Sequence, residues 1–319
     1  MSIDVRARCI PLFALLVAGL GAAPGGRLFA EDSAAPKPGK EQVETYRFGV
    51  EIKAVGIPCR AILATLPVPT DWPEQTVTVL GEEKSRHVTK VEYRLLSGGA
   101  KQMRVTIPTL PAGAEAKVTV TYQVRRHTLL KPEGTADLLL PKASTKLRSY
   151  LAPSPYIEST DEKIRSLAGE VTLGKELPWQ RAEAIYDCVR AKVKYQNGPL
   201  KGALAALNDG TGDCEELTSL FIALCRADKI PARTVWVPGH CYPEFYLEDK
   251  SGDGHWFPCQ AAGTRAFGGI PELRPILQKG DNFRVPENRN QPQRYVTQFL
   301  TARSGRPTVK FIQERVSGG

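Results

Sequence analysis

Apolar and polar residues alternate with a period of two along much of residues 42–130, and this alternation is typical of half-buried β-strands. Stretches rich in Pro and Gly separate the runs and mark where the chain reverses. The runs are 46–54, 77–79, 91–95, 103–107 and 118–124, and the reversals are 66–73, 98–99 and 111–113. The pattern predicts an antiparallel β-sandwich.

The period changes after residues 131–158, a connection with several prolines that is predicted to be a linker. Ser159 and Glu162 have the spacing of a capping box at the start of a helix. Pro178 suits the first turn of a second helix, which leads into a strand-like segment at 193–195. Apolar residues follow one face of each helix, namely Ile164, Leu167, Ala168 and Val171, then Ala182, Ile185, Tyr186 and Val189.

The N-terminus is typical of an export signal, predicted over residues 1–30. Arg6 and Arg8 precede an apolar run from Cys9 to Ala23, and Ala30 is placed for cleavage. The run is too short for a membrane span, and no later run approaches about 18 to 20 apolar residues. We predict an exported protein with no transmembrane helix in its mature chain, with an uncleaved anchor as the alternative.

Composition and charge exclude some classes of protein. With 319 residues, 42% hydrophobic and 24% charged, the chain is long enough for two domains with cores and is not disordered as a whole. Its formal charge of +9 falls to +7 without residues 1–30, which hold three Arg and one Asp. Basic residues are scattered among acidic ones, so no nucleic-acid partner is expected.

Cys214 follows a Gly-Asp turn and precedes an apolar helical stripe, which places it in the first turn of a buried helix. The stripe consists of Leu217, Leu220, Phe221, Leu224 and Cys225. Unpaired backbone N–H groups and the helix dipole stabilise a thiolate at this position and lower the thiol pKa. The alternative is a small buried cysteine that only packs.

Two strands of a hairpin follow, at 235–246 and 255–260. The order of a helix-start Cys, an Ile-Pro-Ala-Arg turn, a His four residues before a Glu, and a polar residue after a Trp resembles the transglutaminase-like superfamily over residues 179–263. The resemblance implies Cys214 as nucleophile and His240 as base. It places Gln260 at the third position, where the family usually has Asp. A neutral amide can still accept a hydrogen bond from the imidazole and fix its tautomer.

The resemblance completes the predicted fold, which is α+β. An N-terminal antiparallel β-sandwich at 42–130, preceded by a flexible leader at 31–41, is followed by a transglutaminase-like (papain-like) domain at 159–319. In that domain the helix that carries the catalytic Cys packs on an antiparallel sheet.

The implied activity is thiol-dependent acyl transfer on protein or peptide amides, and it requires no cofactor and no metal. Hydrolysis, as in a protease or amidase, and transamidation both occur on this scaffold. The alternative is a catalytically silent binding module of the cell envelope.

The other histidines have simpler interpretations. His87 and His127 lie in the β-domain and are interpreted as surface or hydrogen-bonded residues, and His255 is a minor candidate base. A zinc site is disfavoured because no Cys-x-x-Cys pair is present, and because adjacent strand residues face opposite sides of a sheet. Such a site would combine Cys214, His240, Cys241, His255 and Cys259.

The hairpin register gives a geometric prediction. If His240 faces Gln260, then Cys241 faces Cys259 on the other side of the sheet. Two facing cysteines in an exported protein form either a disulfide or a packed thiol pair. Glu244 lies two pleat repeats from His240 and is not expected to replace Gln260.

Overall fold

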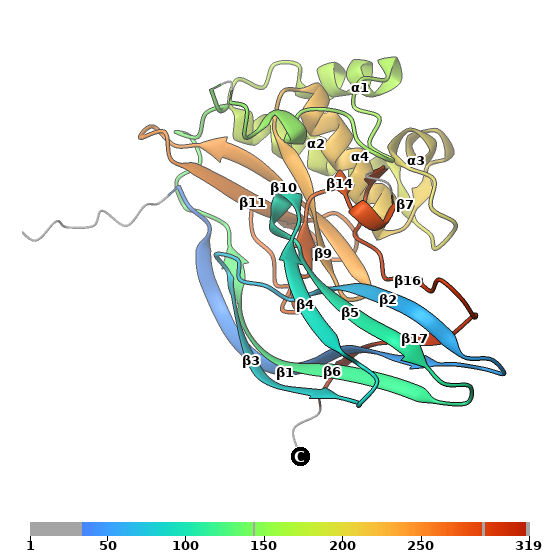
Figure 1. Ribbon diagram of the computed structural model, residues 1–319. Coiled ribbons are helices and arrows are strands. Elements are labelled where there is room, and N and C mark those ends of the chain that lie inside the picture. The colour runs from blue at the N-terminus through green and yellow to red at the C-terminus, as the bar shows by residue number, and fades with distance from the viewer. Residues whose placement is uncertain (1–33, 143, 289–290, 317–319) are drawn as a thin grey trace, which may run out of the picture. The chain divides into compact units, whose positions relative to one another are not determined.

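The alternating segment forms two antiparallel sheets in the computed structural model, which describes residues 34–142, 144–288 and 291–316 (Figure 1). The first sheet has the strand order β17-β1-β6-β3, and the second has the order β16-β2-β5-β4. Their strands are β1 (Lys37–Lys53), β2 (Cys59–Val68), β3 (Gln75–Lys84), β4 (Lys90–Leu95), β5 (Lys101–Leu110), β6 (Glu115–Leu130), β16 (Phe299–Thr301) and β17 (Thr308–Arg315).

Alternate residues of both sheets share one hydrophobic core. Phe48 and Val120 enter it from the first sheet, and Ile62 and Val105 enter it from the second. All four side chains are at most 1% exposed. Two antiparallel sheets around one core agree with the predicted antiparallel β-sandwich.

Two features of the sandwich differ from the prediction. Strand β1 begins at Lys37, inside the predicted leader, because Lys37 pairs with Leu130 of the long strand β6. Strands β16 and β17 come from the C-terminal segment and pair with β2 and β1. An alternating pattern does not indicate which strand pairs with which, so only the tertiary structure reveals these pairings. The division into domains stays a prediction.

A second group of elements contains the predicted Cys helix and hairpin. A five-stranded sheet has the order β12-β11-β10-β9-β13, and Figure 1 shows the helices gathered on one side of its central strands. The strands are β9 (Ala232–Val237), β10 (His240–Glu248), β11 (Gly254–Gln260), β12 (Ala266–Phe267) and β13 (Gln278–Lys279), and the helices are α1 (Glu162–Thr172), α2 (Pro178–Lys192), α3 (Ala203–Asp209) and α4 (Cys214–Ala227). Short strands pair as β7 (Lys194–Tyr195) with β8 (Thr211–Gly212) and β14 (Phe283–Arg284) with β15 (Pro292–Gln293).

Aromatic residues join helix α2 to this sheet. The ring centroid of Trp179 lies 5.5, 5.2 and 5.0 Å from those of Phe245, Phe257 and Phe267. Burial of each such side chain contributes about 1.5–3 kcal/mol. The α+β fold, with helix α4 packed on β9 and β10, agrees with the prediction.

Helix α1 begins differently from the prediction. Its N-cap is Asp161, whose carboxylate accepts a hydrogen bond from the backbone N–H of Lys163 at 2.9 Å. The predicted capping box from Ser159 to Glu162 is therefore wrong, because Glu162 is already inside the helix and the nearer carboxylate satisfies the free N–H group. Pro178 does stand in the first turn of α2, as predicted.

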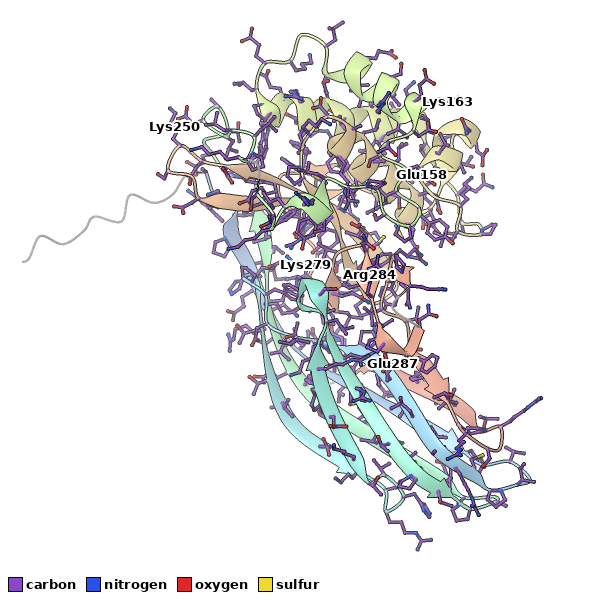
Figure 2. All side chains as sticks on the ribbon, turned by 45° about the horizontal axis from the view of Figure 1, so that its top comes forward. Glu158, Lys163, Lys250, Lys279, Arg284 and Glu287 are labelled. Carbon is purple, nitrogen blue, oxygen red and sulfur yellow. The ribbon has the colours of Figure 1, made fainter. Side chains whose placement is uncertain are left out.

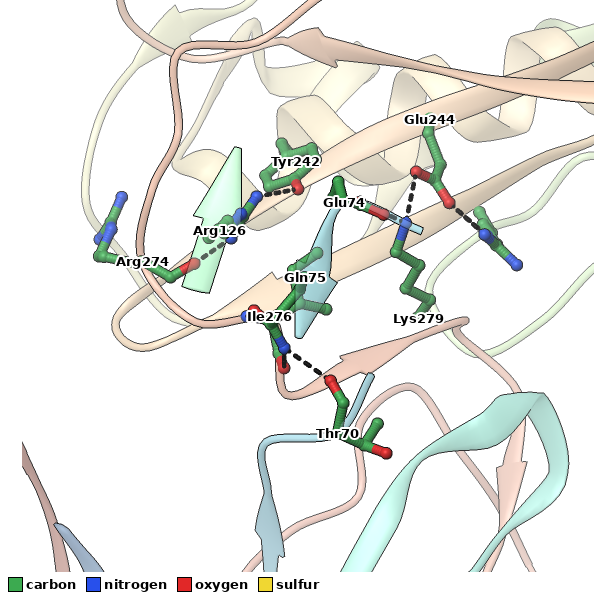
Figure 3. A network of polar contacts seen from close by, with 10 residues as sticks. Thr70, Glu74, Gln75, Arg126, Tyr242, Glu244, Arg274, Ile276 and Lys279 are labelled. Carbon is green, nitrogen blue, oxygen red and sulfur yellow. Dashed lines mark hydrogen bonds and ion pairs between the residues drawn. The ribbon is translucent and has the colours of Figure 1, made fainter. Parts of the chain in front are cut away.

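A buried charge network joins the sandwich to the second sheet (Figure 3). Lys279 of β13 pairs with Glu74, which precedes β3, at 2.7 Å and with Glu244 of β10 at 3.2 Å. Glu244 also pairs with Arg233 of β9 at 2.5 Å. Lys279, Glu74 and Glu244 are at most 6% exposed, and Figure 2 shows Lys279 between the two groups of strands.

Hydrogen bonds reinforce the same junction. Arg126 of β6 donates to the hydroxyl of Tyr242 on β10 at 2.8 Å and to the carbonyl oxygen of Arg274 (Figure 3). The amide of Gln75 accepts from the N–H of Ile276 at 2.6 Å and donates to the carbonyl of the same residue at 2.9 Å. The loop before β13 is thus fixed to the sandwich.

The predicted signal peptide, with Arg6, Arg8 and Ala30, lies outside the described residues. Among the residues that are described, no helix is long and apolar enough to cross a membrane.

Candidate active site

Helix α4 begins at Cys214 and is capped from both sides. The carboxylate of Asp213 accepts a hydrogen bond from the N–H of Glu215 at 2.8 Å. The carboxylate of Glu216 accepts in return from the N–H of Asp213 at 3.1 Å and from that of Lys201 at 3.0 Å. This capping box fixes the first turn and places Cys214 at the positive end of the helix.

Gly212 is required by the packing of the cap. A Cβ atom at this position would lie 2.4 Å from the Cβ of Glu216 and 3.0 Å from its Cγ. Glu216 is only 2% exposed, so its side chain has little room to withdraw. The Gly-Asp-Cys order therefore has a steric reason in addition to the turn.

His240 is the first residue of β10 and follows a tight turn from β9. Gly239 in that turn has a φ of +67°, a conformation that strains residues with a Cβ. The guanidinium of Arg274 donates to the carbonyl of Pro238 at 3.0 Å. Arg274, which belongs to neither β9 nor β10, thus holds the turn between these two strands. The turn directs His240 toward the start of α4.

Gln260, the last residue of β11, contacts the imidazole. The Nε2 atom of His240 lies 3.4 Å from Oε1 of Gln260 and 3.3 Å from its Nε2. The side chain of His240 also interacts with that of Cys214. The structure therefore brings together the three predicted site residues.

The backbone of Gln260 is anchored by helix α2. Its carbonyl accepts from the hydroxyl of Tyr186 at 2.8 Å and from Arg190 at 3.2 Å, and Arg190 also donates to the carbonyl of Ala261 at 3.0 Å. The sequence pattern placed Tyr186 on an apolar stripe and gave no reason to single out Arg190. Only the packing of α2 against the end of β11 reveals their role in positioning Gln260.

The electrostatics of the site favour a charged pair. The neighbouring thiol of Cys241 and the imidazole of His240 outweigh burial and lower the pKa of Cys214 to about 4. Burial opposes protonation of His240, but its contacts with Cys214 and Gln260 raise the pKa of His240 above its usual value. Together these shifts stabilise a thiolate beside an imidazolium.

The predicted facing of Cys241 and Cys259 is wrong. In the hairpin, Glu244 lies opposite Pro258 and Tyr246 opposite Trp256, two residues out of the predicted register. The loop that joins the two strands is residues 249–253, two residues longer than the predicted register requires. It is closed by a hydrogen bond from the N–H of Asp249 to the carbonyl of Asp253 at 2.9 Å. Both cysteines are free thiols.

The shift of two residues leaves each side chain on its predicted face. His240 and Gln260 therefore still meet, as diagonal rather than facing neighbours. Cys241 turns toward α4, where its Sγ lies 3.5 Å from the carbonyl oxygen of Cys214. Cys241 thus belongs to the site, contrary to its predicted separation from the catalytic pair.

The remaining histidines contact other groups. His255 lies 3.0 Å from Asp249, His127 lies 3.3 Å from Glu41, and His87 contacts Arg86. Within the described part of the chain, no three His, Cys, Asp or Glu side chains are grouped to hold a metal ion.

Residues 165–261 match the model of the transglutaminase-like superfamily. The chain carries a transglutaminase-like domain. The match contains Cys214, His240 and Gln260 and overlaps most of the segment whose motifs resemble the family. No curated protein matches the chain.

Two solved structures are similar to this chain, and the first of them shares its fold. A protein of Cytophaga hutchinsonii named a "Putative Cysteine Protease" is 18% identical, with a TM-score of 0.57 over 88% of this chain and 93% of that one. A "Putative Protease" of Parabacteroides distasonis is 15% identical, with a TM-score of 0.28 over 67% of this chain and 47% of that one. The Cytophaga structure extends the likeness beyond the transglutaminase-like domain to most of the chain.

Proposed function

We propose that this protein is a thiol-dependent acyl-transfer enzyme that acts on amide bonds of proteins or peptides through Cys214, His240 and Gln260. The observation that carries the proposal is the contact of a helix-start cysteine with an imidazole that is itself held by an amide. A thiolate and an imidazolium in contact supply the nucleophile and the proton donor of such a reaction.

In the proposed reaction, the Cys214 thiolate attacks the carbonyl carbon of an amide. Backbone N–H groups at the start of α4 stabilise the oxyanion, and His240 transfers its proton to the leaving amine. The product is a thioester on Cys214. Attack by water completes hydrolysis, whereas attack by an amine completes transamidation.

Gln260 acts in this scheme by orienting His240. Its amide contacts Nε2 of the imidazole and so restrains the orientation of the ring. A neutral amide stabilises the imidazolium less than a carboxylate does, so we expect slower turnover than with Asp at this position.

The predicted export signal supports an activity in the cell envelope or outside the cell, and we propose a protein or peptide as substrate. The name of the Cytophaga structure, "Putative Cysteine Protease", is consistent with such a substrate. A catalytically silent binding module is the competing function, and the neutral third residue is the observation that favours it.

The first test is selective labelling of the intact protein with a thiol-directed electrophile, followed by mass spectrometry. At neutral pH, Cys214 is expected to react well before Cys188 and Cys225, because burial raises the pKa of both of those thiols. The variant Cys214→Ala should fold normally and lose the fast-labelled site. Equal rates for all thiols would contradict the proposal.

The second test separates the outcomes of the reaction. The protein is incubated with unfolded protein substrates, with and without an excess of a primary amine, and with Cys214→Ala as control. New peptide termini indicate hydrolysis, and incorporated amine indicates transamidation. A reactive Cys214 with neither product would favour the binding module.

A further inference from the structure

Cys241 lies against the nucleophile but takes no covalent part in the proposed reaction. It follows His240 on β10, is 1% exposed, and points toward helix α4. Its Sγ lies 3.5 Å from the carbonyl oxygen of Cys214 and 3.8 Å from Oγ1 of Thr218, one helical turn further along. The side chain is therefore enclosed between its own strand and the first turn of α4.

The two neighbouring cysteines differ in ionisation. The Cys241 thiol makes the largest contribution to the lowered pKa of Cys214. Burial, and then the contact with Cys214, raise the pKa of Cys241 well above its usual value. At neutral pH the site thus holds a thiolate on Cys214 and a thiol on Cys241, whose Sγ contacts the backbone of Cys214.

The other described cysteines lie elsewhere. Cys225 and Cys259 are buried in the core between the helices and the sheet, and Cys59 is buried in the sandwich core. Cys188 lies on α2 and packs against the same helix–sheet core. Among the cysteines that the structure describes, Cys241 is thus the thiol placed to react with an oxidised Cys214.

We propose that Cys214 and Cys241 form a reversible disulfide when a peroxide oxidises Cys214. The disulfide itself requires only the contact of the two residues. Its consequence, that the enzyme is switched off and its nucleophile protected, rests on the proposed function.

The chemistry takes two steps. The Cys214 thiolate attacks one oxygen of hydrogen peroxide, the O–O bond breaks, and proton uptake yields a sulfenic acid and water. The sulfur of Cys241 then attacks the sulfenic sulfur, an S–S bond forms, and the hydroxyl leaves with the Cys241 proton as a second water. Peroxide is reduced, and the two thiols are oxidised to one disulfide.

The competing reaction is further oxidation. Without a nearby thiol, a sulfenic acid that meets more peroxide becomes a sulfinic acid, which thiol reductants do not reverse. Cys241 is expected to intercept the sulfenic acid because it is already in place. The presence or absence of Cys241 should therefore decide whether oxidation of Cys214 is reversible.

The test maps the oxidised cysteines of the full-length wild-type chain. The reduced protein is treated with limited hydrogen peroxide, free thiols are alkylated, and the protein is digested with trypsin. We expect peptide 202–226, which contains Cys214, to be linked to peptide 234–250, which contains Cys241. Because Cys225 shares the first peptide, fragmentation assigns the linked residue. Dithiothreitol should release the link and restore labelling of Cys214.

Variants supply the controls. Cys241→Ser keeps nearly the same side-chain volume and should convert reversible loss of Cys214 labelling into permanent loss, with a gain of two oxygen atoms on peptide 202–226. In Cys225→Ala the link to Cys241 should persist. The inference is overturned if wild-type Cys241 remains alkylatable after Cys214 is oxidised, or if Cys214→Ala still forms the link.

The readout is a covalent mass, so this inference and the proposed function fail separately. A linked pair in a protein that turns over no amide would contradict the function alone. An active protein whose Cys214 overoxidises despite Cys241 would contradict the switch alone.

Discussion

At the scale of single residues, the chemistry of the site depends on Cys214, His240 and the two side chains that contact them, Cys241 and Gln260. Cys241 and His240 lower the pKa of Cys214, and Cys214 and Gln260 raise that of His240. The pair of thiolate and imidazolium therefore forms above a pH of about 4, where Cys214 ionises. It is lost at higher pH, where His240 gives up its proton. If turnover needs the imidazolium, its rate should rise as the pH increases through the pKa of Cys214. The rate should fall again at a pH above the usual pKa of histidine, because the pKa of His240 is raised.

The first prediction concerns the rate of alkylation of Cys214 between pH 6 and pH 9. For a thiol with the usual pKa of about 8.5, the thiolate fraction rises roughly 200-fold over this interval. Cys214 should change its rate less than about threefold, because its thiolate is already formed at the acidic end. The rates are measured by stopped labelling and mass spectrometry, with Cys188 as internal control. A steep rise of the Cys214 rate toward pH 9 would contradict the lowered pKa.

The second prediction concerns Gln260. Gln260→Leu removes the group that holds Nε2 of His240 and should cost about 2–4 kcal/mol of transition-state stabilisation. Gln260→Asp should preserve or raise kcat/KM, because a carboxylate also accepts from the ring and stabilises the imidazolium. Steady-state kinetics of both variants give the comparison. If the Leu variant keeps wild-type kinetics, Gln260 has no part in the mechanism.

At the scale of elements, the start of α4 and the hairpin behind it set the site geometry. The capping box of Asp213 and Glu216 fixes where the helix begins, and Gly212 leaves the space that Glu216 occupies. The loop at 249–253 sets the hairpin register, and this register makes His240 and Gln260 diagonal neighbours. A change in where α4 begins would move Cys214, and a change in the hairpin register would move His240 relative to Gln260.

The third prediction concerns Gly212→Ala. The added methyl group would overlap Glu216, so the substitution should destabilise the fold by about 1–3 kcal/mol and slow the labelling of Cys214. Denaturant unfolding measures the first effect and timed alkylation the second. Gly198→Ala is the matched control, since a Cβ there meets no atom within 4 Å, and it should change stability by less than about 0.5 kcal/mol. Equal behaviour of the two variants would exclude the steric explanation.

At the scale of the whole molecule, the sandwich and the five-stranded sheet are joined through buried charges. Lys279 pairs with Glu74 and Glu244, and the pairing outweighs burial and lowers the pKa of Glu74. The ionised form of Glu74 thus stabilises the folded state above its usual pKa, and this contribution is lost as the pH falls through the lowered value. Breaking a buried pair costs far more than breaking an exposed one, because the remaining charge has no partner and no water.

The fourth prediction is that Lys279→Met lowers the free energy of unfolding by about 3–5 kcal/mol at neutral pH. The loss should be smaller in acid, because an unpaired Glu74 then takes up a proton. Lys250→Met is the control, since the pair of Lys250 with Asp137 is exposed and worth at most about 1 kcal/mol. Denaturant titrations at neutral and acidic pH measure the loss of unfolding free energy in each of the two variants. A loss as small as that of Lys250→Met would show that the network does not stabilise the junction.

The sequence by itself determined the local structure and the chemical identity of the site. Period-two alternation identified strands because side chains alternate between a core and a solvent face, and the stripe after Cys214 identified a buried helix with the cysteine in its first turn. The motif order then indicated His240 and Gln260. These features depend on neighbouring residues along the chain, so a single sequence contains them.

Only the tertiary structure decided how distant segments pair. The addition of β17 to β1, the register of the hairpin, and the approach of Cys241 to Cys214 join residues whose individual patterns fit several partners. A loop that is longer by two residues leaves every side chain on the same face, so the alternating pattern cannot detect it. The position of Arg190 behind Gln260 likewise follows from how α2 packs on the sheet, which is a property of the folded core and not of the local sequence.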